Sequence, residues 1–373
     1  MLTGKNIVLP EMALARNKGV SLQKFYDYCT EHQLAFVFYR LPGEKNINII
    51  CQHNSTLLKN EKQFGNIPGF VFAPFAASAS CPKLLIRADY TFTEDTIGLP
   101  IFQNATTVVA KHLPSYSPTT KKEFLSLVQS IKEGITKNQL RKVVAARVRL
   151  VNKPSTFHPA LFFKKLCHAY PAAFVSLVYT PATGTWVGAT PEMLLSVNGN
   201  EYSTHSLAGT RYTKNGKWGK KEETEQQIVS DYIQTVFRKV TKVKPLVTGP
   251  ETVLAGNLAH IRTTFTFRGI APFNRQKVLA LLHPTPAVAG IPKQKALRFI
   301  RANERSPRNY YSGYLGIVNM NGKTKLFVNL RCMHVLHKKL AVFSGCGVTQ
   351  DSVPEREWKE TEMKMKTLLN VLR

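Results

Sequence analysis

The sequence of 373 residues predicts a mixed α/β fold of the α+β type, built from antiparallel strands and intervening helices. Short turns join neighbouring apolar runs as hairpins at residues 198–200 and at Asn321-Gly322. Two long segments, in the middle and at the end of the chain, have helical apolar periodicity. The strands are not separated by regular helical crossovers, which argues against a doubly wound parallel sheet.

The first third of the chain, residues 1–118, mixes short apolar runs with Pro and Gly and contains no chemical motif. The runs at 34–38, 47–50 and 70–75 are expected as strands joined by turns.

A helix is predicted over residues 121–137, where apolar residues recur at four- and three-residue steps: Phe124, Val128, Ile131 and Ile135. A strand is predicted at 142–150. Its alternation places Lys142 on the same face as Val144, Ala146, Val148 and Leu150, so that a lysine begins an apolar face.

Further strands are predicted at 174–179, 193–197, 201–207, 311–319, 325–335 and 340–344. A long helix has apolar positions from 228 to 240 and acidic first turns, and a final helix is predicted at 354–372.

Lys and Arg number 51 against 23 Asp and Glu, a formal net charge of +28. These residues are spread along the chain without a basic tail, a zinc finger or an RNA-binding aromatic motif. We interpret the charge as a solvated surface that attracts a dianionic substrate. Nucleic-acid binding is the less favoured alternative, and it would be strongly salt-sensitive.

The six cysteines are scattered without metal-site spacing, so free thiols are expected. The longest apolar run, near residues 70–81, is short and broken by Pro74, and no apolar stretch follows a basic start. A cytoplasmic protein with no membrane partner is therefore expected, with a monomer as the default.

Four motifs occur in a fixed order: WVGATPE at 186–192, LAGTR at 207–211, LHPTPA at 282–287 and EWKET at 357–361. Together they resemble the motifs of the chorismate-utilising enzymes, from about residue 121 to the end. The resemblance implies a large single chorismate-binding domain of two antiparallel sheets with helices packed outside. Residues 1–118 would be a divergent N-terminal part of this fold, and residues 119–373 the catalytic region.

Three positions indicate which reaction the resemblance implies. Ammonia-using relatives carry glutamine where Lys142 stands, and aminodeoxychorismate synthases place a nucleophilic lysine at the position of Ala208. Salicylate and anthranilate synthases typically have Thr-Val where this chain has Ala287-Val288. The implied reaction is that of isochorismate synthase, an isomerase: water adds at C2 of chorismate as the C4 hydroxyl leaves, for menaquinone or siderophore biosynthesis. Salicylate synthesis, with loss of pyruvate, is the alternative.

The resemblance makes Lys142 the base for water and Glu192 the acid for the departing hydroxyl. A base must be a neutral amine, and full burial lowers a lysine pKa by as much as ~3–5 units. Glu192 would need a raised pKa. The alternatives are a lysine extended to solvent at a strand start and an exposed strand-end glutamate.

Glu225 and Glu360 match the family's metal-ligand positions, and Mg²⁺ prefers one or two carboxylates with waters and substrate oxygens. The alternative is an exposed helix ion pair for each, with Lys221 and Lys364, worth about 0.3–0.5 kcal/mol. Glu357 shares a helical face with Glu360 and Lys364, which would place it just outside the metal ligands.

Chorismate carboxylates require fixed donors. Arg331, expected at the end of a strand, can bind a carboxylate through two parallel hydrogen bonds, while Gly209 and Gly345 allow close backbone approach. Further residues match pocket positions of the family: His260, Ala287, Tyr311, Leu330 and Lys364. A hydrogen-bonded core histidine is an equal alternative for His260.

The chain departs from the family's pattern at three places. Ala145-Ala146 replaces Leu-Ser, Gln226 stands where a histidine is common, and Asn309 replaces a glycine. No departure removes a charged catalytic group, so we expect effects on rate rather than loss of activity.

Overall fold

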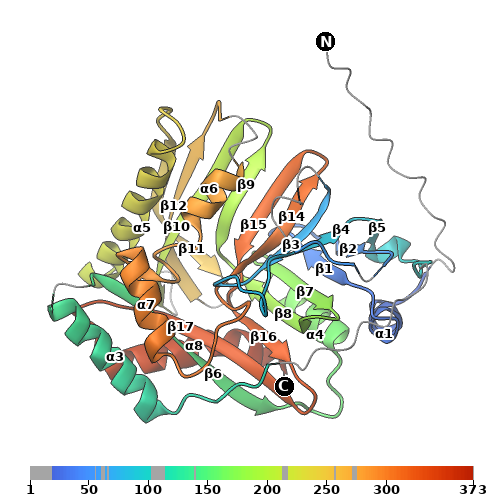
Figure 1. Cartoon of the computed structure of the whole chain (residues 1–373), viewed down its shortest axis with the longest axis horizontal. Coiled ribbons are helices and arrows are strands. Elements are labelled where there is room, and N and C mark those ends of the chain that lie inside the picture. Colours follow the sequence, from blue (N-terminus) through green and yellow to red (C-terminus); the bar gives the residue numbers. More distant parts are fainter. Residues whose placement is uncertain are drawn as a thin grey trace.

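The computed structural model describes residues 19–54, 56–59, 64, 67–101, 114–137, 140–211, 217–255, 258–270 and 275–372. These residues form two large antiparallel sheets with helices on their outer faces (Figure 1). The predicted α+β class is therefore confirmed. No helix among the described residues is long and apolar enough to span a membrane.

The first sheet has nine strands in the order β13-β6-β17-β16-β8-β7-β1-β2-β5. Their bounds, in that order, are Gly290–Ile291, Lys142–Asn152, Lys339–Val348, Cys332–Val335, Gly184–Thr190, Phe174–Thr180, Phe36–Arg40, Asn48–Cys51 and Tyr90–Thr93. The second sheet has eight strands in the order β11-β12-β10-β9-β15-β14-β3-β4. Their bounds are Leu246–Ala255, Leu258–Phe267, Glu201–Arg211, Met193–Asn198, Lys323–Val328, Tyr314–Met320, Gly69–Ala73 and Leu84–Arg87.

Strands from the first third of the chain belong to both sheets. β1, β2 and β5 extend the nine-stranded sheet beyond β7, while β3 and β4 extend the eight-stranded sheet beyond β14. The apolar runs at 34–38, 47–50 and 70–75 are thus strands, as expected.

Helices cover the outer faces of both sheets. The nine-stranded sheet packs against α1 (Leu22–Glu31), α4 (Pro159–Ala169) and α8 (Pro354–Leu372). α5 (Lys220–Arg238) and α6 (Arg275–Leu282) cover the eight-stranded sheet. α3 (Lys121–Thr136) and α7 (Lys293–Asn303) pack around the end of the first sheet at β6. A 3-10 turn, η1 (Glu94–Thr96), follows β5.

An aromatic core fills the space between the sheets. Phe174 of the first sheet stacks on Phe327 of the second, with 4.1 Å between the ring centroids. Phe72 stacks on Tyr310 with a centroid distance of 4.0 Å. Ala146 and Val148 of β6 join this core, and their neighbours Val143 and Ala145 face α3 and α7 instead. The alternation predicted for residues 142–150 is therefore confirmed.

The structure corrects the expected strand at 325–335, which is two strands in different sheets. β15 ends at Val328 in the eight-stranded sheet, and β16 begins at Cys332 in the nine-stranded sheet. Arg331 lies in the crossing segment with a φ of +47°, not on a strand. Apolar alternation continues on both sides of the crossing, so local periodicity conceals it.

Two further expectations are corrected. Tyr311 lies in the turn before β14 rather than on a strand, and the next residue, Ser312, has a φ of +60°. Residues 22–31 form helix α1 in a part of the chain expected to hold strands and turns. Ser21 caps this helix, because its side chain accepts a hydrogen bond from the Lys24 backbone N–H at 3.2 Å.

Candidate active site

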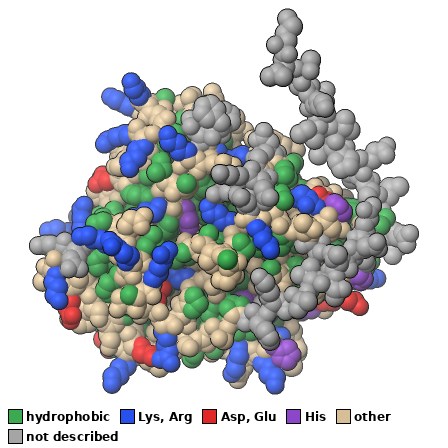
Figure 2. Space-filling model, in the orientation of Figure 1, with side chains coloured by type: hydrophobic (Ala, Val, Ile, Leu, Met, Phe, Trp, Pro, Cys, Tyr) green, Lys and Arg blue, Asp and Glu red, His purple; other side chains and the backbone are tan. Residues whose placement is uncertain are grey.

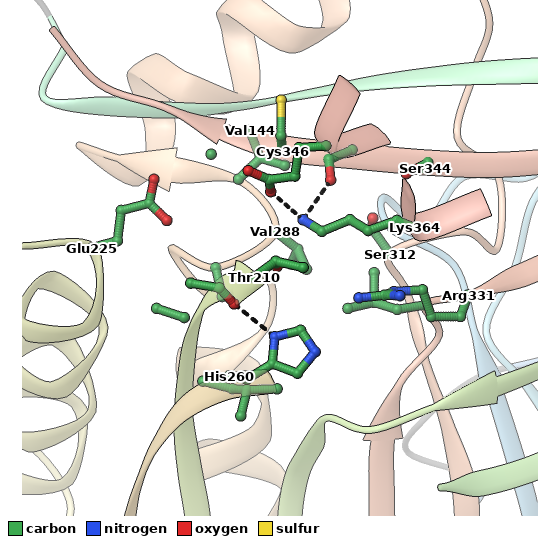
Figure 3. A pocket seen from close by; sticks show the side chains of 18 of the residues that line it. Val144, Thr210, Glu225, His260, Val288, Ser312, Arg331, Ser344, Cys346 and Lys364 are labelled. Carbon is green, nitrogen blue, oxygen red and sulfur yellow. Dashed lines mark hydrogen bonds and ion pairs between the residues drawn. The ribbon is translucent and has the colours of Figure 1, made fainter. Parts of the chain in front are cut away.

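A cavity of about 80 Å³ lies where the two sheets and the helices α5 and α8 meet (Figure 3). Eleven of the twelve residues predicted for the site line it: Lys142, Gly209, Glu225, His260, Ala287, Tyr311, Leu330, Arg331, Gly345, Glu360 and Lys364. The twelfth, Glu192, follows the lining residue Pro191. The fold thus brings together residues that are up to 222 positions apart, from Lys142 to Lys364.

Lys142 begins β6 and is buried, with only 2% of its surface exposed. Its Nζ lies 3.7 Å from Oε2 of Glu225. A lysine extended to solvent is therefore the wrong interpretation. Gly347 on the neighbouring strand β17 makes room for this pair, because a Cβ there would lie 2.8 Å from Lys142 Cε and 2.9 Å from Glu225 Oε1. Gly347 was not among the predicted site residues, although it is two residues from Gly345.

Glu192 lies between β8 and β9 and is also buried, so the exposed alternative is wrong. Its backbone N–H donates to Thr190 Oγ1 at 3.3 Å, and its carbonyl accepts from the Val328 N–H at 2.9 Å. Burial raises the pKa of the Glu192 carboxyl to about 7, against the opposing effect of Lys142, Lys364 and Arg331. A raised pKa is what an acid working near neutral pH requires.

The two carboxylates predicted for the metal come from opposite sides of the cavity, Glu225 from α5 and Glu360 from α8. Burial raises the pKa of Glu225 despite Lys142 and Lys221. Burial also acts to raise the pKa of Glu360, but Lys364 and Lys221 outweigh it, so this pKa is lowered. Lys364 Nζ lies 2.6 Å from Glu360 Oε1, so the ion pair given as the alternative for Glu360 is present, but its side chains are only 17% and 22% exposed. Lys221 pairs with Glu357 rather than with Glu225.

The chemistry of these carboxylates fits a hard divalent cation. Glu225 Oε1 is buried and has no hydrogen-bond partner among the described residues. No group of three or more His, Cys, Asp or Glu in this part of the chain forms a complete ligand set. A site with two carboxylates and open positions is the pattern that Mg²⁺ prefers, since it retains waters or substrate oxygens.

Two further cationic side chains, Arg331 and Lys364, line the cavity. Arg331 is buried, and its Nη1 donates to Thr367 Oγ1 at 3.0 Å. Burial lowers the pKa of its guanidinium to about 10, which leaves it charged at neutral pH. Lys364 Nζ donates to the Gly345 carbonyl at 3.0 Å. In Figure 3, Arg331 and Lys364 lie on the same side of the cavity, facing Thr210 and His260.

His260 is both hydrogen-bonded and part of the cavity wall, so its two interpretations do not exclude each other. Its Nδ1 lies 2.6 Å from the Gly209 carbonyl. Because a carbonyl only accepts, Nδ1 carries the hydrogen and Nε2 is an acceptor. Burial, with Arg331 nearby, lowers the pKa of His260 to about 3, so the ring is neutral. Nε2 is buried and has no partner within the described part of the chain.

Two serines that were not predicted as site residues also line the cavity. Ser312 and Ser344 are buried, and their hydroxyls have no hydrogen-bond partner among the residues that the structure describes. Each is next to a predicted residue, Tyr311 or Gly345, but no spacing rule distinguishes them from other serines. Their position follows from the turn before β14 and from β17.

A family model described as "Chorismate binding enzyme" matches residues 100–373, and the chain belongs to this family. Isochorismate synthase EntC of Escherichia coli K12 is 27% identical over 244 residues, which cover 62% of this chain and 62% of that protein. The salicylate biosynthesis isochorismate synthase of Pseudomonas aeruginosa is 30% identical over 198 residues, or 50% of this chain and 42% of that protein. The chain thus aligns with less than two thirds of the length of either relative.

A solved structure of similar fold is that of a putative 2,3-dihydroxybenzoate-specific isochorismate synthase, DhbC, from Bacillus anthracis. It superposes with a TM-score of 0.75 at 22% identity and covers 93% of this chain and 99% of that one. At this level of identity the likeness shows the fold alone.

Proposed function

We propose that the protein is a Mg²⁺-dependent isochorismate synthase, which converts chorismate to isochorismate. The observation that carries the proposal is a cavity lined by the buried amine of Lys142, with the buried Glu192 carboxyl, whose pKa is about 7, next to the lining residue Pro191. Lysine at the position where ammonia-using relatives carry glutamine favours water as the nucleophile. Two relatives named as isochorismate synthases support the same reaction.

The reaction needs a base and an acid at two ring carbons. Lys142 takes a proton from water as the oxygen forms a bond to C2 of chorismate. The ring double bonds shift, the C4–O bond breaks, and Glu192 gives its proton to the departing hydroxyl, which leaves as water. One water enters and one leaves, so the product is an isomer of the substrate.

The two carboxylates of chorismate would be bound by different groups, one by a cationic side chain and the other by the metal ion. Arg331 would bind one carboxylate of chorismate, with the neutral His260 and the hydroxyls of Ser312 and Ser344 as nearby polar groups. Glu225 and Glu360 would hold Mg²⁺, and the unpartnered Glu225 Oε1 supports this assignment. The ion would neutralise the other carboxylate of the substrate.

The product is expected to leave without loss of pyruvate, because Ala287-Val288 replaces the Thr-Val pair of salicylate and anthranilate synthases. Isochorismate would then serve menaquinone or siderophore biosynthesis.

The metal assignment is tested by Glu225→Ala and Glu360→Ala. Each variant should lose magnesium-dependent turnover and keep its fold, because Glu225 and Glu360 are the two carboxylates that line the cavity in the described part of the chain. Turnover is measured by separating the products of chorismate by mass, and the fold by circular dichroism.

The matched controls are Glu223→Ala on α5 and Glu355→Ala on α8, both exposed, which should retain parent activity. Full activity of either metal-site variant at limiting magnesium would contradict the assignment. Salicylate with pyruvate as the products would instead identify a salicylate synthase.

A further inference from the structure

An ion pair next to the cavity joins the two helices that carry the proposed metal ligands. Lys221 Nζ on α5 lies 2.6 Å from Glu357 Oε1 on α8. The Glu357 side chain is 2% exposed and that of Lys221 is 23% exposed. α5 packs on the eight-stranded sheet and α8 on the nine-stranded sheet, so the pair bridges the two layers of the fold.

Lys221 is also one of three lysines that face three glutamates. Lys142 lies 3.7 Å from Glu225, and Lys364 lies 2.6 Å from Glu360. Lys142 and Lys364 line the cavity, whereas Lys221 does not, and the proposed reaction gives it no part.

Helical spacing places the Lys221 ammonium close to the proposed metal position. Lys221 is one turn before Glu225 on α5, and Glu357 is one turn before Glu360 on α8. The ammonium, paired with the buried Glu357, also interacts electrostatically with Glu360 and Glu225. A divalent ion bound by Glu225 and Glu360 would be repelled by this fixed positive charge.

We propose that Lys221 is a fixed cation that limits the affinity of the site for divalent metal. This inference rests on the proposed metal site. Glu357 holds the ammonium in place, and the pair sets the charge that an incoming ion meets. Removal of the Lys221 charge should tighten metal binding. Removal of both charges should return the affinity close to that of the parent.

A purely mechanical role for the pair predicts the opposite sign. If the Lys221–Glu357 contact mattered because it holds α5 and α8 together, its loss would separate Glu225 from Glu360 and weaken metal binding. Tighter metal binding after loss of Lys221 would therefore indicate an effect of charge, and weaker binding would indicate mechanical support.

The test uses Mn²⁺ as the probe and the full chain without chorismate, and it measures free Mn²⁺ by electron paramagnetic resonance. Lys221→Met should lower the dissociation constant by about tenfold or more, since a unit charge a few ångströms from a divalent ion acts strongly at intermediate dielectric. Lys221→Met/Glu357→Gln should bind within about threefold of the parent, as expected when two coupled effects offset each other. Lys220→Met, an exposed lysine one residue away, is the matched control and should not change binding.

Unchanged or weaker Mn²⁺ binding in Lys221→Met, with its fold intact by circular dichroism, would overturn the inference and leave the proposed function standing. If the double variant bound as tightly as Lys221→Met, Glu357 would have no part in the charge balance, which would also overturn it. A parent that binds no Mn²⁺ and turns over chorismate without added metal would contradict the metal site itself, and the inference with it.

Discussion

Burial of Glu192 gives its carboxyl a raised pKa that could not be recognised from the sequence around it. A glutamate after a strand is usually exposed and ionised at neutral pH. Here burial raises the pKa of its carboxyl to about 7, even though three cationic side chains favour the charged form. Desolvation therefore outweighs attraction, and a proton is available near neutral pH.

This environment predicts how the rate depends on pH. The acid is present below its pKa and lost above it, so kcat should fall as pH rises through about 7. Glu192→Gln should lose at least the ~10²–10⁴-fold typical of general acid–base catalysis. The measurement is kcat at saturating chorismate over roughly pH 6–9, for the parent and the variant. A parent rate that does not decline on the alkaline side would contradict the role of Glu192.

For single residues, the sequence indicated which side chains belong to the site better than it indicated which residues they contact. The motifs led to eleven residues that line one cavity, but local spacing paired Lys221 with Glu225, whereas Lys221 contacts Glu357. That contact joins two helices from different layers of the fold. Ser312, Ser344 and Gly347 were missed because their importance depends on which strands become neighbours.

At the scale of single elements, helix α8 carries core-packing residues and cavity-lining residues on adjacent faces. Thr361, Met365 and Leu368 are buried, while Glu360 and Lys364 line the cavity. Packing of the buried stripe against the nine-stranded sheet therefore fixes the height and rotation at which Glu360 enters the cavity.

Met365→Ala should therefore destabilise the protein. Truncation of a buried methionine leaves a cavity and costs about 2–5 kcal/mol, so the melting temperature should fall. Met363→Ala, at a partly exposed position on the same helix, is the control and should cost less. Thermal unfolding followed by circular dichroism provides the comparison. Equal losses in the two variants would contradict the packing described for α8.

The type of an element was predicted correctly where its apolar pattern extended over many residues, as in α3, β6 and α8. The break between β15 and β16 could not be predicted, because apolar alternation continues on either side of Arg331. The crossing is decided by long-range pairing, β15 with β9 and β14, and β16 with β8 and β17. The same crossing places the Arg331 guanidinium in the cavity between the sheets.

At the scale of the whole molecule, the site exists only because the two sheets meet. Lys142 comes from the nine-stranded sheet, Gly209 and His260 from the eight-stranded sheet, and the carboxylates from α5 and α8. Only the resemblance of the ordered motifs, not local periodicity, indicated that these segments share one cavity. Figure 2 shows Lys and Arg scattered over the visible face rather than gathered in one stripe, in keeping with a solvated surface.

The central claim is that this cavity adds water, activated by Lys142, to chorismate. The most direct test is a single incubation with chorismate and Mg²⁺ in water enriched in oxygen-18, with concentrated ammonium present and the products analysed by mass. The account predicts isochorismate with one solvent oxygen on the ring and no nitrogen, and a loss of at least ~10²–10⁴-fold in Lys142→Gln. An aminated product, or near-parent turnover by Lys142→Gln, would contradict it.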